Sequence, residues 1–189
     1  MNIFILDYDP VKAARMQCNK HICKMVTESG QMLSTAHRML DGVIEKRPSK
    51  SGKRMVNYYK HPDADLEARL YNAVHFHHPC TVWTMESSAN YRWHFTHFIA
   101  LCNEYKYRYG KEHMTDNKMR RLLAQYPKNI PNKKQTPFAL AMGAAPECVN
   151  SNDPVQSYRT FYQTKQDRFK MVWTKREIPE WFKMKETLQ

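Results

Sequence analysis

Residues 18–40 read CNKHICKMVTESGQMLSTAHRML, and this stretch decides the fold that the sequence predicts. Apolar or small side chains recur in it at steps of three and four, which is the spacing of one buried helix face. These positions are Cys18, Ile22, Val26, Ser29, Leu33, Ala36 and Leu40. Upstream, Asp9-Pro10 combines an N-cap acceptor with a proline at the first helical position. We therefore expect one long helix from about residue 10 to Leu40. Gly30 costs about 1 kcal/mol relative to alanine there, so it predicts a kink or close packing.

The rest of the chain is mostly helical in pattern. Pro79 and Asp153-Pro154 begin two helices, and Gly110 ends the first of these. The predicted helices after the first are 65–76, 79–109, 115–126 and 154–173. We expect an all-α, single-domain bundle of about five helices with a short N-terminal strand or extended segment at residues 2–6. Its parts are a helical core in 1–126, a proline-containing loop or lid in 127–151, and a C-terminal helix and tail in 152–189.

Charge and composition restrict the class of protein. The 189 residues carry 30 Lys+Arg against 18 Asp+Glu, a formal net charge of +12. Such a surplus favours polyanionic partners, because each phosphate contact releases condensed counterions. The N-terminus lacks the pattern of a signal peptide, and no apolar run approaches the roughly 18 residues of a membrane span. We expect a cytoplasmic protein with no membrane partner.

A basic segment follows the first predicted helix. Residues 44–62 include EKRPSKSGKR and then NYYKHP, a run rich in Lys, Arg, Ser, Gly and Pro. Such a loop suits a mobile contact with nucleic acid, and a solvated connector is the alternative.

A polar stripe accompanies the buried face of the first predicted helix. At 100° per residue, His21, Lys24, Glu28 and Gln31 fall within about 80° of one another. A carboxylate beside Lys and His can act as a general base or electrostatic stabiliser, and the cations can clamp an anion. The alternative is an ordinary surface ion pair, because Lys and Glu at i, i+4 are common on exposed helices.

The histidines and cysteines do not form a metal motif. His75, His77 and His78 lie together, with His94 and His97 a few turns further on, but H-E-x-x-H is absent. The five cysteines contain no C-x-x-C pair. We expect neither a metal site nor a cofactor.

Several motifs resemble one known family. They are NKHICK at 19–24 with Glu28 following, HPCTVW at 78–83, CNEY at 102–105, and RYG at 108–110. Their order resembles phage and bacterial proteins grouped with the pyrimidine-dimer DNA glycosylases of the endonuclease V type, over about the first 110 residues. The chain is also similar, over nearly its whole length, to uncharacterised phage proteins that open Met-Asn-Ile-Phe.

The resemblance implies roles for residues of the stripe. Glu28 matches the family's catalytic glutamate, which supports attack at the sugar C1′ and stabilises the cationic intermediate, and His21 matches a histidine one helical face earlier. The family's nucleophile is an N-terminal α-amine freed by removal of the initiator Met before a small residue, whereas Asn2 follows Met1 here. Thr27 and Gln31 stand where the family has the arginines that hold the damaged duplex. A lyase step and pyrimidine-dimer specificity are therefore not implied.

Together these observations predict a phage-type protein that acts on double-stranded DNA, with one base flipped out of the stack. We expect a DNA glycosylase-like hydrolase for a damaged or modified base, with Glu28, His21 and Lys24 as catalytic residues. Two alternatives remain: a non-catalytic nucleic-acid-binding or host-interaction protein, and an enzyme acting on a free nucleotide under the 127–151 lid. The expected nucleic-acid contacts are Lys20, Gln31, Arg47, Lys53, Arg54, His78 and Arg108.

Overall fold

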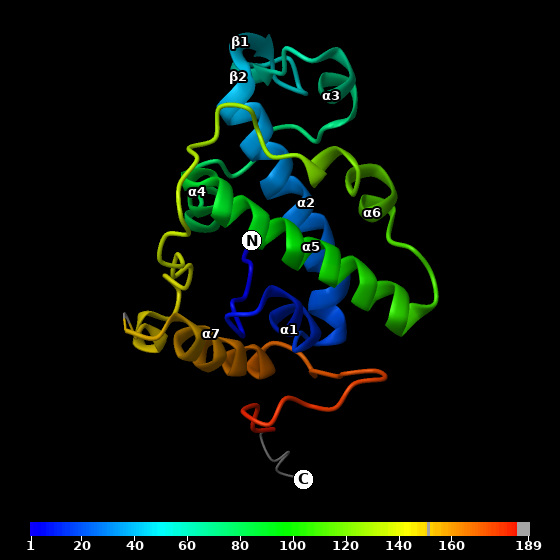
Figure 1. The fold of residues 1–189 in the computed structure, drawn as a ribbon, viewed down its shortest axis with the longest axis vertical. Coiled ribbons are helices and arrows are strands. Elements are labelled where there is room, and N and C mark those ends of the chain that lie inside the picture. Colours follow the sequence, from blue (N-terminus) through cyan, green and yellow to red (C-terminus); the bar gives the residue numbers. More distant parts are fainter. Residues whose placement is uncertain (151, 185–189) are drawn as a thin grey trace.

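Two long helices, α2 (Asn19–Asp41) and α5 (Ser88–Tyr109), form the centre of the computed structural model, which describes residues 1–150 and 152–184 (Figure 1). They pack against each other, and α1 (Pro10–Arg15) packs against α5. The helix α4 (Pro79–Glu86) contacts both long helices. The remaining elements are β1 (Val43–Pro48), β2 (Met55–Lys60), α3 (Ala64–Arg69), α6 (Met114–Met119), α7 (Pro154–Gln163) and the 3-10 turns η1 (Leu122–Ala124), η2 (Pro146–Cys148) and η3 (Thr164–Asp167).

The predicted apolar face of α2 is the face that the protein buries. Ile22, Val26 and Leu33 are fully buried in the core, and Leu40 at the end of the helix is half-buried. The helix continues through Gly30, where a side chain would not fit: a Cβ there would lie 2.6 Å from Cγ2 of Thr115 in α6. Close packing of two helices therefore explains this glycine.

The expected all-α bundle of about five helices is wrong, because the chain folds into a mixed architecture with seven α-helices and a two-stranded sheet in its described part. The strands β1 and β2 pair antiparallel, from Val43 opposite Lys60 to Pro48 opposite Met55. Gly52 takes a positive φ of 71° in the turn between them, which glycine adopts without strain. Residues that favour strands, such as Val56 and Tyr58, alternate with polar ones here, and the high charge of the segment made it resemble a loop.

The helices also begin and end differently from the sequence pattern. The expected helix from residue 10 to Leu40 is broken at residues 16–18, and the expected 79–109 helix is broken at Ser87. Ser87 is fully extended, and its hydroxyl accepts a hydrogen bond from the Asn90 amide at 3.0 Å, so it ends α4 and caps α5. Residues 2–6 form no strand, because Phe4 has a positive φ of 58°.

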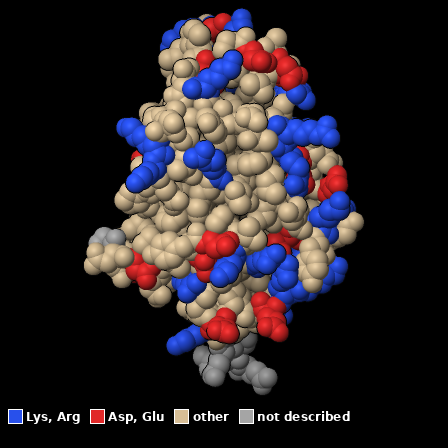
Figure 2. Space-filling model, in the orientation of Figure 1, with Lys and Arg blue, Asp and Glu red and all other residues tan. Residues whose placement is uncertain are grey.

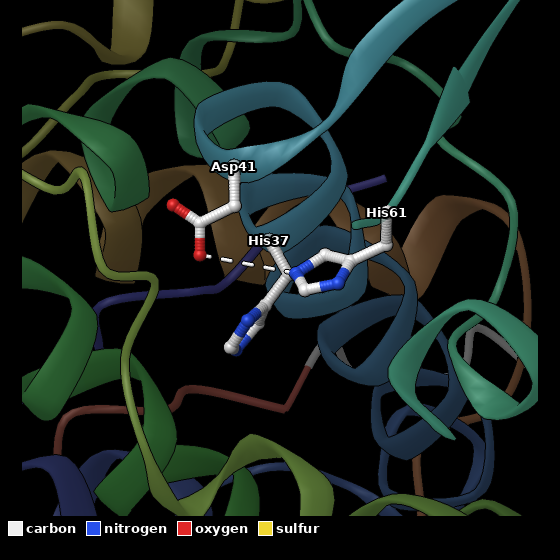
Figure 3. A group of neighbouring side chains, drawn as sticks. All are labelled: His37, Asp41 and His61. Atoms are coloured by element: carbon white, nitrogen blue, oxygen red, sulfur yellow. Dashed lines mark ion pairs between the residues drawn. The ribbon is translucent and has the colours of Figure 1, made fainter. Parts of the chain in front are cut away.

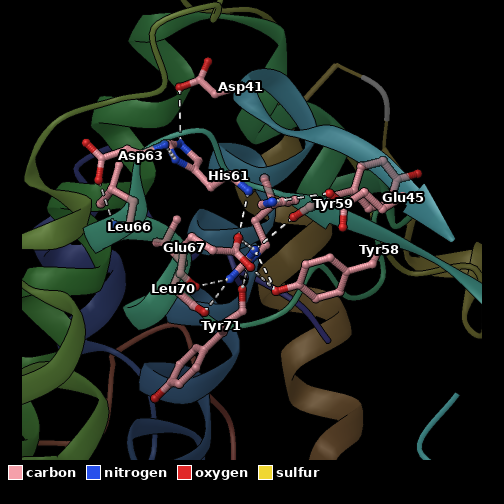
Figure 4. A network of polar contacts seen from close by, with 12 residues as sticks. Asp41, Glu45, Tyr58, Tyr59, His61, Asp63, Leu66, Glu67, Leu70 and Tyr71 are labelled. Atoms are coloured by element: carbon pink, nitrogen blue, oxygen red, sulfur yellow. Dashed lines mark hydrogen bonds and ion pairs between the residues drawn. The ribbon is translucent and has the colours of Figure 1, made fainter. Parts of the chain in front are cut away.

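The hairpin and α3 are held to the upper end of α2 by Arg38, whose side chain is 1% exposed. Figure 4 shows the polar network in which its partners lie, among them Tyr59, Glu67 and Leu70. Its Nη1 donates to Glu67 Oε2 at 2.6 Å and to the Tyr59 carbonyl oxygen at 2.9 Å. Its other nitrogens donate to the carbonyl oxygens of Glu67, Leu70 and Tyr71. The buried guanidinium of Arg38 thus binds β2, α3 and the residues directly after α3 at the same time.

No helix within residues 1–150 and 152–184 combines the length and the apolar character that crossing a lipid bilayer requires.

Candidate active site around Glu28

The carboxylate of Glu28 faces the N-terminal segment of the chain. Its Oε1 lies 3.2 Å from Lys24 Nζ, one turn earlier on α2. Its Oε2 accepts a hydrogen bond from the backbone amide of Asn2 at 3.1 Å and lies 3.7 Å from the α-amino nitrogen of Met1. The Lys24 ammonium, the Asn2 amide and the Met1 amine therefore lie around this carboxylate. Solvent still reaches it, because the Glu28 side chain is 12% exposed. The predicted Lys24–Glu28 pair is confirmed, and its surroundings are not those of an open surface pair.

The N-terminal segment reaches Glu28 because its first residues are fixed by tertiary contacts. The Asn2 side chain accepts from the Phe4 amide at 3.0 Å and donates to the Ala141 carbonyl oxygen at 2.8 Å. Phe4 holds its left-handed conformation, which costs about 1–2 kcal/mol, because its ring is buried against His21 and Tyr162. Contacts made from distant parts of the chain therefore position the amide that binds Glu28.

His78 lies within electrostatic reach of the same carboxylate. It caps α4, with Nδ1 accepting from the Cys80 amide at 3.2 Å. Burial is the main cause that lowers the pKa of His78, followed by the charges of the N-terminal amine and His75. The Glu28 charge and the Met1 carbonyl oxygen act in the opposite direction, which places His78 within electrostatic reach of Glu28. The sequence suggested His78 only as a nucleic-acid contact.

His21 points away from the ion pair and packs against α7. Its Nδ1 lies 2.6 Å from the Tyr162 hydroxyl, and its ring is buried between Phe4 and Phe169. Burial, then the charges of nearby lysines including Lys24, lowers the pKa of His21 to about 3. The imidazole is therefore neutral at neutral pH and joins two helices instead of adding a positive charge beside Glu28.

Lys165 is a neighbour that no sequence pattern indicated. It lies in η3, 8% exposed, with Nζ 3.4 Å from the centroid of the Phe161 ring. Burial is the main cause that lowers its pKa to about 8, and Lys24 contributes in the same direction. The charge of Lys165 in turn acts on His21. Lys165 in η3 is thus a second lysine, besides Lys24, that lies near the first turns of α2.

Comparisons with family models, with curated proteins and with solved structures give no match.

The predicted nucleic-acid contacts do not form one surface. Arg47, Lys53 and Arg54 belong to the hairpin and its turn at one end of α2, and Lys20 lies in the first turn at the other end. The two groups are separated by about 30 Å of helix. On the face shown in Figure 2, Lys and Arg side chains occur in several groups around a broad area of other residues, with acidic side chains among them.

Local partners limit what some of these side chains can bind. Arg47 stacks over the Tyr58 ring at 3.5 Å and pairs with Glu45 at 2.8 Å, whereas Lys53 and Arg54 are exposed. Gln31 is half-buried. Arg108 is buried and bonded to Glu104 and to the carbonyl oxygens of residues 15 and 17, so its guanidinium holds α1 and α5 together and does not face a ligand.

A further basic cleft lies between α1 and the C-terminal segment. Its volume is about 680 Å³, and a tryptophan and several cations line it together with two glutamates. The basic residues are Lys12, Arg15, Arg159, Lys175 and Arg176. The sequence pattern did not suggest this cleft, because its two sides are more than 140 positions apart in the chain.

Proposed function

We propose that the chain is an enzyme of the DNA glycosylase type that acts on a damaged or modified base, with Glu28 as its catalytic carboxylate. The observation that carries the proposal is the setting of Glu28, whose carboxylate contacts Lys24 and the Asn2 amide while its side chain is still 12% exposed. The charge of +12 supports a polyanionic substrate.

The chemistry follows from the charge that develops as a base leaves. Cleavage of an N-glycosidic bond builds positive charge on the sugar, and a fixed carboxylate stabilises that charge. Lys24 lies beside the carboxylate and is 62% exposed, so it can contact a phosphate of the extruded nucleotide. His21 acts through Tyr162 as a positioning residue, since its neutral ring joins α2 to α7.

The test is formation of abasic sites on a panel of duplexes that carry damaged or modified bases. We expect Glu28→Gln to lower the single-turnover rate about 100-fold or more, because the charge that stabilises the transition state is lost. Glu112→Gln is the matched control: this exposed glutamate also pairs with a lysine, Lys106, at 2.9 Å, and its loss should leave the rate unchanged.

Each alternative gives a distinct result. Equal rates for wild type and Glu28→Gln would remove Glu28 from the mechanism. Salt-sensitive binding of every duplex without any product would support the non-catalytic protein instead. Stabilisation by a mononucleotide, with none by oligonucleotides, would favour the enzyme that acts on a free nucleotide.

A further inference from the structure

Three side chains of the kinds that bind transition metals converge at the upper end of α2 (Figure 3). His37 and Asp41 lie one turn apart on the helix, and His61 follows strand β2. One ligand atom of each lies within 4.8 Å of the other two, and His61 Nε2 is 3.8 Å from Asp41 Oδ2. None of the three belongs to the site around Glu28, which lies about 14 Å away along the helix.

Two ring nitrogens of this trio are buried without a hydrogen-bond partner. They are Nδ1 of His37, a residue 2% exposed, and Nε2 of His61, a residue 3% exposed. Buried polar atoms are nearly always paired, so two unpaired nitrogens beside one carboxylate require an explanation. A bound cation would supply the missing partner to both.

The groups around the trio orient it for a ligand. The Tyr91 hydroxyl donates to the Leu123 carbonyl oxygen at 3.1 Å, so it accepts from His37 Nε2–H at 2.9 Å. The lone pair of His37 is therefore on Nδ1, the ring nitrogen that is buried without a hydrogen-bond partner. The backbone amides of Lys128 and Asn129 hold the two oxygens of Asp41 at 2.8 and 2.9 Å. Metal-binding histidines and carboxylates are held in this way.

We propose that His37 Nδ1, Asp41 Oδ2 and His61 Nε2 form a binding site for a first-row divalent transition cation such as Zn²⁺. Two imidazoles and one carboxylate suit zinc and its neighbours, whereas Ca²⁺ and Mg²⁺ prefer oxygen ligands. Zinc bonds of about 2.0–2.2 Å in a tetrahedron place ligand atoms about 3.4 Å apart, so the present ligand atoms, which lie within 4.8 Å of one another, would move closer together on binding. Three protein ligands leave a fourth position for water.

Binding requires one rearrangement at His61. Its Nδ1 accepts a hydrogen bond from the Asp63 amide at 3.1 Å, which places the proton of the neutral ring on Nε2. A cation at Nε2 moves that proton to Nδ1 and releases the Asp63 amide. Asp63 is exposed, so water can replace the lost partner. The site would tie the end of α2 to the chain after β2 and, through Asp41, to residues 128–129.

The experiment uses the full chain, stripped with a chelator and dialysed. Titration with ZnSO₄ in a calorimeter should show one site per chain, and zinc should raise the melting temperature. Co²⁺ in its place should give the strong visible bands of a low-coordinate site. We expect His37→Gln and His61→Gln to weaken zinc binding more than 100-fold. Tyr91→Phe, which keeps all three ligands, should weaken it about 10–100-fold.

His77→Gln is the matched control, because this exposed histidine lies outside the trio. It should bind zinc like the wild type. A wild-type chain that binds no stoichiometric zinc would overturn the proposal, and so would loss of binding in His77→Gln. If a ligand variant loses its circular-dichroism spectrum, Tyr91→Phe and the wild-type Co²⁺ spectrum decide the matter, and an octahedral cobalt spectrum would contradict the site.

Discussion

Lys165 has the environment of a nucleophilic amine. Its ammonium group is removed from water against the Phe161 ring, and Arg168 and Lys24 lie near enough to disfavour a further positive charge. Burial first and these cations second lower its pKa to about 8, against about 10.4 for an ordinary lysine. About half of the Lys165 side chains are then neutral at pH 8, and the neutral amine is the form that attacks carbon.

We expect Lys165 to react with a small amine-modifying reagent at lower pH than the exposed lysines do. Reductive methylation followed by peptide mapping should show half-maximal labelling of Lys165 near pH 8. Exposed Lys53 is the internal comparison, and its labelling should continue to rise toward pH 10. Parallel pH profiles at the two positions would contradict the lowered pKa.

At the same scale, local spacing predicted some contacts and not others. The Lys24–Glu28 pair follows from two positions four apart on a helix. The Asn2 amide that completes the setting of Glu28 comes from a segment held by Ala141 and Tyr162, and no pattern within residues 1–6 encodes those contacts. His37 and Asp41 show the i, i+4 spacing of a ligand pair, but His61 reaches them only through the hairpin that the sequence pattern did not predict.

The elements of the chain differ in how clearly the sequence defines them. Local markers define the end of α5 and the start of α7, since Gly110 takes a positive φ of 70° and the Asp153 side chain caps α7 by accepting from the Gln156 amide. The hairpin lacked such clarity because it is held in place by Arg38 and Glu67, residues outside both strands that bind the Tyr59 carbonyl oxygen and the His61 amide. Tertiary contacts of this kind override local propensity.

The Arg38–Glu67 contact makes the stability of this end of the molecule depend on pH. Burial by itself would raise the pKa of Glu67, but hydrogen bonds from the Tyr58 hydroxyl, the His61 amide and Arg38 lower it to about 2. The folded-state pKa is below the ordinary value of about 4.5, so the stabilisation is complete above that pH. It is lost as the pH falls from about 5 toward 2 and amounts to at most about 3 kcal/mol.

We expect Glu67→Gln to remove this part of the pH dependence. Urea unfolding between pH 7 and pH 3 should show a free energy of unfolding that falls less steeply in the variant than in the wild type. Glu112→Gln, at an exposed pair, should keep the wild-type slope. Identical slopes for wild type and Glu67→Gln would show that the network does not stabilise the folded state.

Across the whole molecule, α2 separates two basic regions. Figure 1 shows the hairpin at one end of this helix and α1 and α7 near the other. From Glu28 to Asp41 the helix rises about 20 Å, and a strand of six residues adds up to about 20 Å more. The hairpin turn thus lies up to about 40 Å from Glu28, which corresponds to about 12 base pairs of duplex.

Under the proposed function, a DNA duplex that contacts both basic regions must be longer than one that contacts only the site around Glu28. We expect the double variant Lys53→Ala and Arg54→Ala to bind a duplex of about 24 base pairs more weakly than the wild type does. Its slope of log affinity against log salt should fall by about 2, because each lost phosphate contact removes about 0.9. A duplex of about 8 base pairs with the same central base should show no difference, since it cannot reach the turn.

Lys133→Ala with Lys134→Ala removes the same charge from an exposed part of the 127–151 loop and controls for net charge. Equal losses of affinity for the two duplexes would mean that Lys53 and Arg54 act only through the overall charge of the protein. No loss of affinity for either duplex would show that the hairpin does not contact DNA.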